Sequence, residues 1–226
     1  MAFEDPRSKL FFEFVRLLKA LKPRYFLLEN VVMSKKSQDI ISEHLGVEPR
    51  KLNSSLTSAQ NRVRLYWANF EIESPPDSGI ELDSVLDYLD VAGRFSLYGK
   101  HLNGGTIVGR RLGPDGKRKD LDLSIPITQC LEVRSVNRNK SNCLTTVAKD
   151  TILTPLPIGR HPGAFKNNLP FRNYTTPERL RLMNLPVNYC DMISENQALK
   201  ATGNGWDAGM ITHIFKELKP FLASKK

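Results

Sequence analysis

The sequence predicts an α/β fold into which a loop-rich lobe is inserted. Residues 6–22 repeat apolar side chains at helical spacing, and the short apolar run 25–28 follows almost directly. A helix followed by a buried strand is a building unit of layered α/β domains. Beyond about residue 75, glycine and proline break the chain into short pieces, which predicts the inserted lobe.

The N-terminal third should supply two helices and two strands. Asp5 is expected to cap the first helix, with Pro6 at its first helical position. Residues 25–28 are expected to form a strand buried on both faces, with Glu29 and Asn30 just past its end. A second helix over residues 37–45 and a second strand over residues 63–70 complete this part.

The region after residue 75 is expected to be mainly loops with short strands at most. Loops held by an ordered scaffold are a common place for recognition. Helical signals return where Thr176 caps, and Pro177 starts, a helix that runs through Met183. A last helix with one apolar face is expected over residues 208–222 and should dock on a core.

The charge of the chain is unevenly distributed. The 226 residues, 40% of them hydrophobic, suffice for one core or for one core plus a smaller lobe. Of the net charge of +9, residues 91–149 hold eleven Lys or Arg against four acids, a surplus of seven. Residues 1–90 hold twelve bases against fourteen acids. The basic segment suits a nucleic acid, although a solvated basic surface explains the charge equally well.

Neither a membrane span nor a signal peptide is indicated, because the chain has no run of eighteen apolar residues and no basic and apolar block at its start. We expect the protein to stay where it is made: in the cytoplasm or on the nucleoid of a prokaryotic or viral host, or in a eukaryotic nucleus. Cys130, Cys143 and Cys190 are odd in number and lack metal-ligand spacing, which favours a reducing compartment and no metal site.

Two groups of residues have the composition of a reactive site. Glu29 follows a strand at the edge where α/β sheets form ligand crevices, although a hydrogen-bonded strand end is the simpler interpretation. Arg62 and Arg64 are two residues apart on a strand and so should share one face. Two such guanidinium groups can clamp a phosphate or a base carbonyl, although an exposed strand face is the more common explanation.

Five short motifs, considered together, resemble a known family. In their order and approximate spacing they resemble the later blocks of the DNA (cytosine-5) methyltransferases, over about residues 3–70 and 170–222. The motifs are DPRSKLFF at 5–12, ENV at 29–31, QNRVR at 60–64, RNYTTPERLRLM at 172–183 and GNG at 203–205.

The resemblance implies a partial doubly wound, S-adenosylmethionine-dependent methyltransferase domain with an inserted loop-rich target-recognition lobe. Residues 1–74 would be the C-terminal half of the catalytic α/β domain, and residues 75–186 the target-recognition region. Residues 187–226 would be closing helices that return to the catalytic domain. The partner implied is double-stranded DNA, although one branch of the family methylates transfer RNA.

The resemblance also implies residue roles. Glu29, Arg62 and Arg64 would be catalytic: Glu29 would meet the N3 and 4-amino edge of a flipped cytosine, and the arginines would hold the base O2 and a phosphate. S-adenosyl-L-methionine would contact Leu10, Asn204, Gly205 and Trp206, and structural support would come from Asn30, Gln60, Arg172 and Glu178. The sequence departs from the family pattern in two places. After Asn204 many members have Ser or Ala followed by Val, whereas this chain has Gly205 followed by Trp206. Asn184 stands where the family usually has glycine.

The family's opening blocks have no counterpart in this sequence. Neither its Phe-x-Gly-x-Gly cofactor loop nor its Pro-Cys nucleophile occurs, and no cysteine follows a proline. We therefore expect the C-terminal portion or subunit of a methyltransferase, inactive alone and completed by an N-terminal polypeptide. A non-catalytic methyltransferase-like DNA-binding or regulatory subunit is the alternative, and a plain basic DNA-binding protein is another.

Overall fold

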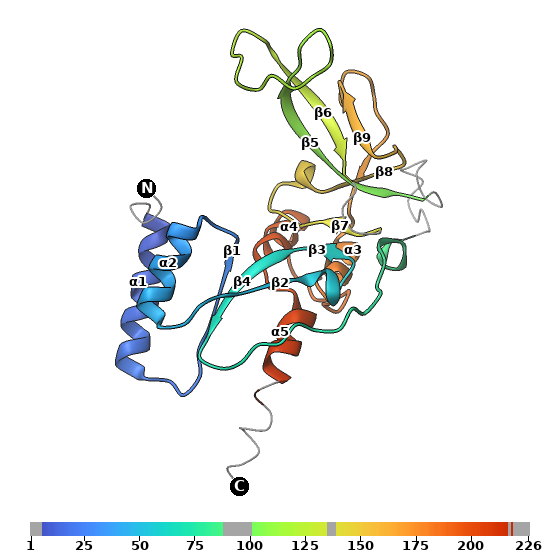
Figure 1. Ribbon diagram of the computed structural model, residues 1–226. Helices are drawn as coiled ribbons and strands as arrows, with labels where there is room; N and C mark the ends of the chain where they lie inside the picture. Colours follow the sequence, from blue (N-terminus) through green and yellow to red (C-terminus); the bar gives the residue numbers. More distant parts are fainter. Residues whose placement is uncertain (1–5, 88–100, 135–138, 217, 219–226) are drawn as a thin grey trace. The chain divides into compact units, whose positions relative to one another are not determined.

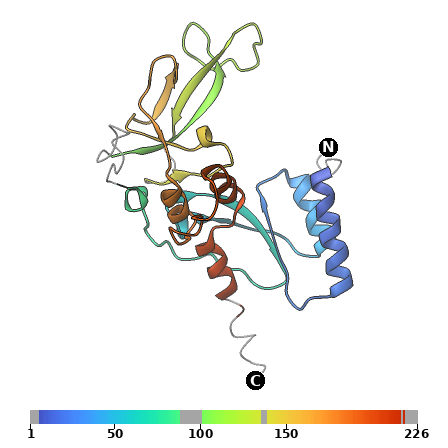
Figure 2. The same ribbon diagram turned by 180° about the vertical axis from the view of Figure 1, so that it is seen from behind.

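The computed structural model describes residues 6–87, 101–134, 139–216 and 218. The chain divides into two compact units. Unit 1 comprises Met1–Asn53, Val63–Pro75 and Thr212–Lys226, and unit 2 comprises Ser54–Arg62 and Pro76–Ile211. Figure 1 shows the elements in chain order, and Figure 2 shows them from behind. Both helices and strands are present in each unit, so the α/β content expected from the sequence is observed.

Unit 1 is an antiparallel sheet with helices on one face. The strands β1 (Leu27–Val31), β4 (Val63–Ala68) and β2 (Arg50–Asn53) lie in the order β1-β4-β2. Helices α1 (Pro6–Leu21) and α2 (Lys35–Leu45) lie side by side in both views (Figures 1 and 2). They bury one face of the sheet in a core formed by Val15, Ile41, Leu45, Leu65 and Trp67. The opposite face of the same strands carries Glu29, Arg64 and Tyr66, because side chains alternate along a strand.

The ends of α2 show why it forms where it does. Ser34 caps the helix by accepting a hydrogen bond from the Ser37 backbone amide, and Gly46 ends it with a left-handed φ of 69°. The Trp67 indole nitrogen donates to Ser42 Oγ at 3.0 Å, which fixes the helix on the sheet. The helix therefore begins two residues earlier than the sequence predicted and ends at the expected residue.

Unit 2 contains a five-stranded antiparallel sheet in the order β10-β8-β5-β6-β9. Its inner face carries Ile107, Leu131, Val133 and Ile152, which form a core cluster with Ala164. The strands are β5 (Asn103–Arg111), β6 (Ile127–Val133), β8 (Ile152–Thr154), β9 (Gly159–Pro162) and β10 (Arg172–Asn173). A separate parallel pair joins β3 (Gln60–Asn61) to β7 (Ser141–Asn142).

The helical part of unit 2 packs on a second core that includes Leu82, Leu102, Leu144, Leu182 and Met183. Capping boxes start both α3 and α4, with Thr175 and Ser194 as the N-caps. The division between the units falls inside α5. The helices are α3 (Thr176–Leu182), α4 (Glu195–Asn204) and α5 (Ala208–Lys216), with the short 3-10 turns η1 (Ser54–Leu56), η2 (Leu82–Val85) and η3 (Ala148–Asp150).

Two expectations about strands were wrong. Glu29 and Asn30 do not follow the first strand but lie within it, opposite Tyr66 and Leu65, and the strand is half-buried rather than buried on both faces. The region after residue 75 holds more than short strands, since β5 has nine residues and β6 has seven. Glycines conceal β5: at Gly109 a Cβ would lie 2.7 Å from Ile127 Cγ2, so close strand packing explains the glycine.

The helix expectations were closer. Helix α1 ends at Leu21, and α3 ends at Leu182 with Met183 as its cap. Asp5, the expected N-cap, lies outside the described residues, as does most of the last helix's expected end after Lys216. The domain boundaries at residues 74 and 186 remain predictions. No helix in the described parts of the chain is long and apolar enough to cross a membrane.

Candidate active site

Glu29 and Arg64 form an ion pair on the sheet of unit 1. Arg64 is directly opposite Val31, so its side chain shares a face with Glu29 two residues away along β1. Its Nε lies 3.0 Å from Glu29 Oε1, and the side chains are only 13% and 15% exposed, respectively. The structure thus brings together two of the three residues predicted to be catalytic.

Asn30 supports the backbone beside this pair. Its Oδ1 accepts a hydrogen bond from the Val31 amide at 2.8 Å, while alternation along β1 directs its side chain away from the face of Glu29. The contact restrains the end of the strand that carries the carboxylate.

Arg62 has a different environment from Arg64. It lies between β3 and β4, is buried, and donates only to groups of unit 2 among the hydrogen bonds of the described residues. Its Nη1 contacts Cys143 Sγ at 3.3 Å and the Leu144 carbonyl at 3.1 Å. Its Nη2 contacts the carbonyls of Gly203 at 3.2 Å and Gly205 at 2.7 Å. The hydrogen bonds of the Arg62 guanidinium lie within unit 2, whereas Arg64 pairs with Glu29 in unit 1, and the shared clamp of the two guanidinium groups stays a prediction.

Gln60 holds three backbone segments of unit 2 together. Its Nε2 donates to the Leu182 carbonyl at 2.8 Å, and its Oε1 accepts from the Leu144 amide at 3.0 Å. Because Gln60 is fully buried, these contacts satisfy groups that would otherwise be costly to remove from water.

Arg172 and Glu178 form a second ion pair, deep inside unit 2. Two parallel contacts of 2.7 Å join the guanidinium to the carboxylate, and the side chains are 1% and 0% exposed. Glu178 also accepts from the amides of Asp87 at 2.9 Å and Thr175 at 2.8 Å. The bidentate pair therefore anchors the start of α3.

The predicted cofactor contacts belong to both units. Leu10 of α1 is 69% exposed, and in unit 2 Trp206 is 45% exposed beside the exposed Asn204. Gly205 has both backbone groups engaged, since its amide donates to the Ala201 carbonyl at 2.7 Å and its carbonyl accepts from Arg62. Leu10, Asn204 and Trp206 are thus accessible, whereas Gly205 would contribute mainly by being small.

Asn184 and Asp207 form a buried contact that the sequence did not predict. Asn184 has φ 55°, a left-handed conformation that asparagine tolerates and glycine adopts freely, which explains how it can replace the usual glycine. Its Nδ2 donates to Asp207 Oδ1 at 3.0 Å, and the Met210 amide donates to the same oxygen at 2.9 Å. Burial raises the pKa of Asp207. An asparagine just past a helix, followed by Leu-Pro, was the available signal for the turn.

No metal centre is found in the described residues. No group of three or more His, Cys, Asp or Glu side chains there could hold a metal ion. All three cysteines are free thiols, and burial raises the pKa of Cys130, which disfavours the reactive thiolate. A cavity of about 520 Å³ lies in unit 1 over Arg50, Tyr66 and Glu73, and none of the predicted site residues lines it.

Comparisons with known proteins agree with the sequence resemblance. Residues 1–75 match the family model of C-5 cytosine-specific DNA methylase. Type II methyltransferase M.FnuDI of Fusobacterium nucleatum is 39% identical over 77 residues, which cover 29% of this chain and 22% of that protein. Type II methyltransferase M1.ScrFI of Lactococcus lactis subsp. cremoris is 23% identical over 248 aligned residues, covering 100% of this chain and 59% of that protein. The chain therefore spans less than two thirds of the length of each of these two relatives.

A solved structure gives the same result for the fold. The S. pombe Dnmt2 methyltransferase superposes with a TM-score of 0.55 at 17% identity, over 97% of this chain and 76% of that one. The predicted fold class is confirmed as the mixed α/β fold of these methyltransferases. Residues 1–75 thus match the DNA (cytosine-5) methyltransferase family, and the chain as a whole is similar to these members of it.

Proposed function

We propose that this chain is the C-terminal portion or subunit of a DNA (cytosine-5) methyltransferase, which methylates C5 of a flipped cytosine in double-stranded DNA. The relatives named type II methyltransferases favour a role in restriction-modification, in the cytoplasm or on the nucleoid of a prokaryotic host. The observation that carries the proposal is the Glu29–Arg64 pair, a carboxylate and a guanidinium 3.0 Å apart on one face of the sheet.

The chemistry needs a proton-handling group beside the base. When a thiolate adds to C6 of cytosine, negative charge develops on the ring, and a proton shared with N3 neutralises it. In our proposal Glu29 shares that proton and accepts a hydrogen bond from the 4-amino group. Arg64 orients the carboxylate through its Nε and is a positively charged group for the base O2 or the adjacent phosphate. Arg62 would act indirectly, by bracing the segment 203–205 through its carbonyls.

Each unit has accessible residues that suit contacts with a cofactor. Leu10 offers an apolar contact, Trp206 an aromatic ring and Asn204 an amide, and all three are exposed enough to be reached by a ligand. S-adenosyl-L-methionine, when bound, supplies the methyl group. The glycine loop and the acidic ribose-binding residue of the family would come from another polypeptide segment.

Two features of unit 1 favour contact with such a segment, joined to this chain or separate. Strand β1 pairs only with β4 among the described strands, so its other edge can accept a further strand. The exposed leucines of α1, namely Leu10, Leu17 and Leu21, add apolar surface beside it. The added segment would bring the cofactor loop and the Pro-Cys nucleophile.

The test is complementation. This chain would be mixed with the N-terminal part of a related methyltransferase that carries the glycine loop and the Pro-Cys block, and transfer of labelled methyl groups to duplex DNA would be measured. We expect transfer with the mixture and none with either part alone. Glu29→Gln should then lower the rate by about 100-fold or more, as loss of a general acid does. Glu43→Gln, which removes an exposed carboxylate on α2, is the matched control.

The outcome also separates the two candidate roles. Equal rates with Glu29→Gln and the unchanged chain would remove Glu29 from catalysis and favour a non-catalytic, regulatory subunit. Failure of methyl transfer with several N-terminal partners, combined with DNA binding by this chain alone, would favour the same alternative.

A further inference from the structure

A charged face covers the outer side of the unit 2 sheet. Antiparallel register places Glu132 of β6 opposite Thr106 of β5 and Arg160 of β9, so these side chains share one face. Arg110 lies on the same face of β5 because it is four residues from Thr106. The alternate positions Ile107 and Leu131 point to the core. The sheet is thus amphipathic, with a polar side built from ionised groups.

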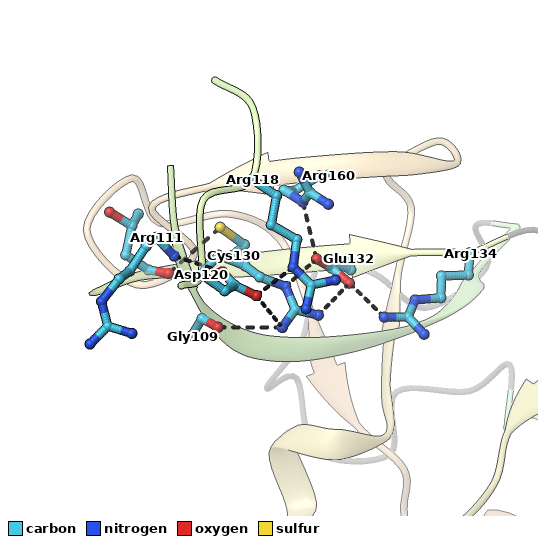
Figure 3. Close-up of polar contacts among 10 residues, drawn as sticks. Gly109, Arg111, Arg118, Asp120, Cys130, Glu132, Arg134 and Arg160 are labelled. Atoms are coloured by element: carbon cyan, nitrogen blue, oxygen red, sulfur yellow. Dashed lines mark hydrogen bonds and ion pairs between the residues drawn. The ribbon is translucent and has the colours of Figure 1, made fainter. Parts of the chain in front are cut away.

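Glu132 binds three arginines at once. Its Oε1 accepts from Arg110 Nε at 2.8 Å and Arg160 Nε at 3.0 Å, and its Oε2 accepts from Arg110 Nη2 at 3.2 Å and Arg134 Nη2 at 2.9 Å. Figure 3 shows Glu132 between Arg160 and Arg134, with dashed lines to both. The carboxylate is 6% exposed although it lies on the outer face, because the arginine side chains cover it. We call Arg110, Glu132, Arg134 and Arg160 the Glu132 cluster.

The cluster has more positive charge than its internal pairing requires. Asp120 adds a second carboxylate and pairs with Arg118 and Arg110, so four arginines face two acids, an excess of two positive charges. Glu132 is held ionised, since hydrogen bonding from Arg110 and then from Arg134 and Arg160 lowers its pKa to about 2. Ion pairs that only stabilised the fold would need one arginine for each carboxylate.

The unused donors point to a ligand. Arg160 is 33% exposed and Arg134 is 61% exposed, and each gives a single guanidinium nitrogen to Glu132. Within the described residues the other guanidinium nitrogens of these two side chains make no hydrogen bond. Ordering arginine side chains before binding lowers the conformational entropy lost when a ligand binds. Two ordered guanidinium groups suit phosphate oxygens, which accept their parallel donors.

We propose that the Glu132 cluster is a phosphate-binding device in which Glu132 positions Arg134 and Arg160 to contact the backbone of duplex DNA. The choice of duplex DNA rests on the proposed function, whereas the anion-binding geometry does not. Glu132 touches no phosphate itself; it acts as a positioning residue. Contacts to the backbone set orientation and affinity, and they carry no base specificity of their own.

Binding of the full chain to a fluorescent DNA duplex, measured by anisotropy over a salt series, tests the proposal. Arg134→Ala and Arg160→Ala should each weaken binding by roughly five- to tenfold and reduce the slope of log affinity against log salt by about 1. Lys166→Ala removes the same charge from an exposed site outside the cluster and should leave the slope nearly unchanged.

Glu132→Gln separates positioning from charge alone. The substitution removes a negative charge. If the cluster acted only through its net positive charge, the variant would therefore bind DNA more tightly. Positioning predicts the reverse, weaker binding by roughly threefold or more, because the arginines lose their common anchor. An unchanged circular dichroism spectrum would show that the variant is folded, and Glu132→Asp, which keeps the charge, should recover part of the affinity.

Three results would overturn the inference while leaving the proposed function intact. One is tighter binding by folded Glu132→Gln; another is an equal loss from Lys166→Ala and the two arginine variants. Methyl transfer in the complementation assay with no effect of the arginine variants on DNA affinity would also reject the cluster as a phosphate site. Loss of methyl transfer with Glu29→Gln is independent of all three results.

Discussion

The two units each contain an Arg–Glu ion pair, and the pairs are constructed in opposite ways. In unit 2, Arg172 and Glu178 share two contacts of 2.7 Å, and two backbone amides complete the carboxylate's hydrogen bonds. In unit 1, Arg64 and Glu29 meet at 3.0 Å on a sheet face, and both retain some exposure. The Glu178 carboxylate is fully buried, whereas the Glu29 side chain is still partly exposed to a ligand.

This difference separates structural from functional use of the same residue types. A buried charge whose acceptor positions are filled by the protein cannot take a new partner without a large free-energy cost. A carboxylate with accessible oxygen atoms can exchange its partner or share a proton. The exposure of each carboxylate, rather than residue identity, therefore indicates which glutamate is the candidate for chemistry.

The largest effect should come from breaking the buried pair. Arg172→Ala leaves Glu178 buried with its amide donors but without its counter-ion, and should lower the free energy of unfolding by about 3–5 kcal/mol. Chemical denaturation followed by circular dichroism measures this. Arg181→Ala, which removes a half-exposed pair with Asp87, should cost under about 1 kcal/mol. If both variants lowered the free energy of unfolding by a similarly small amount, the buried pair would contribute no more to stability than the accessible pair, which would contradict the prediction.

Acid should weaken a third arrangement, the Glu132 cluster, in a defined pH window. The folded-state pKa of Glu132, about 2, is lower than its ordinary value of 4.5, so the ionised cluster stabilises the fold above about pH 4.5. That stabilisation, on the order of 3 kcal/mol, is lost as the pH falls through about 2. Comparing unfolding free energies of the unchanged chain and Glu132→Gln across this window should show the difference shrinking with acid. A difference that stays constant with pH would contradict the assignment.

A buried arginine that forms no ion pair within the described residues gives the intermediate case. Arg62 donates to three backbone carbonyls and one thiol. The two terminal nitrogens of its planar guanidinium contact two different segments of the chain, 143–144 and 203–205. Arg62→Lys should cost about 2 kcal/mol in unfolding free energy, because a lysine ammonium cannot reproduce that geometry and leaves buried acceptors unsatisfied. Arg64→Lys is the matched control and should cost less. Equal costs would mean that the two arginines are equivalent, as their spacing in the sequence had suggested.

Local signals in the sequence predicted the first three helices better than they predicted the strands of unit 2. Apolar spacing and proline located α1, α2 and α3 to within about two residues, since these signals lie within the helix itself; the N-cap of α3 is Thr175, one residue before the predicted Thr176. The strand β5 was missed because Gly104, Gly105 and Gly109 resemble loop residues, and their role depends on close packing against neighbouring strands.

The candidate site was predictable only in part. Motif order singled out Glu29, Arg62 and Arg64, but the pairing of Glu29 with Arg64 depends on the register of β1 against β4. The interruption between β3 and β4 gives Arg62 its separate partners, and no local pattern in the sequence marks it. The Glu132 cluster likewise joins three strands, so only the excess of basic residues in that region hinted at it.

The smallest change in stability should accompany the largest change in activity. Glu29→Gln preserves the shape of the side chain and its capacity to accept a hydrogen bond from Arg64. It should therefore cost about 1 kcal/mol in unfolding free energy, within the range of a partly exposed charge-assisted hydrogen bond. The same variant is expected to abolish most methyl transfer in the complemented enzyme. A loss of stability as large as that of Arg172→Ala would mean that Glu29 is held as a structural charge, and reduced activity could then be explained by misfolding alone.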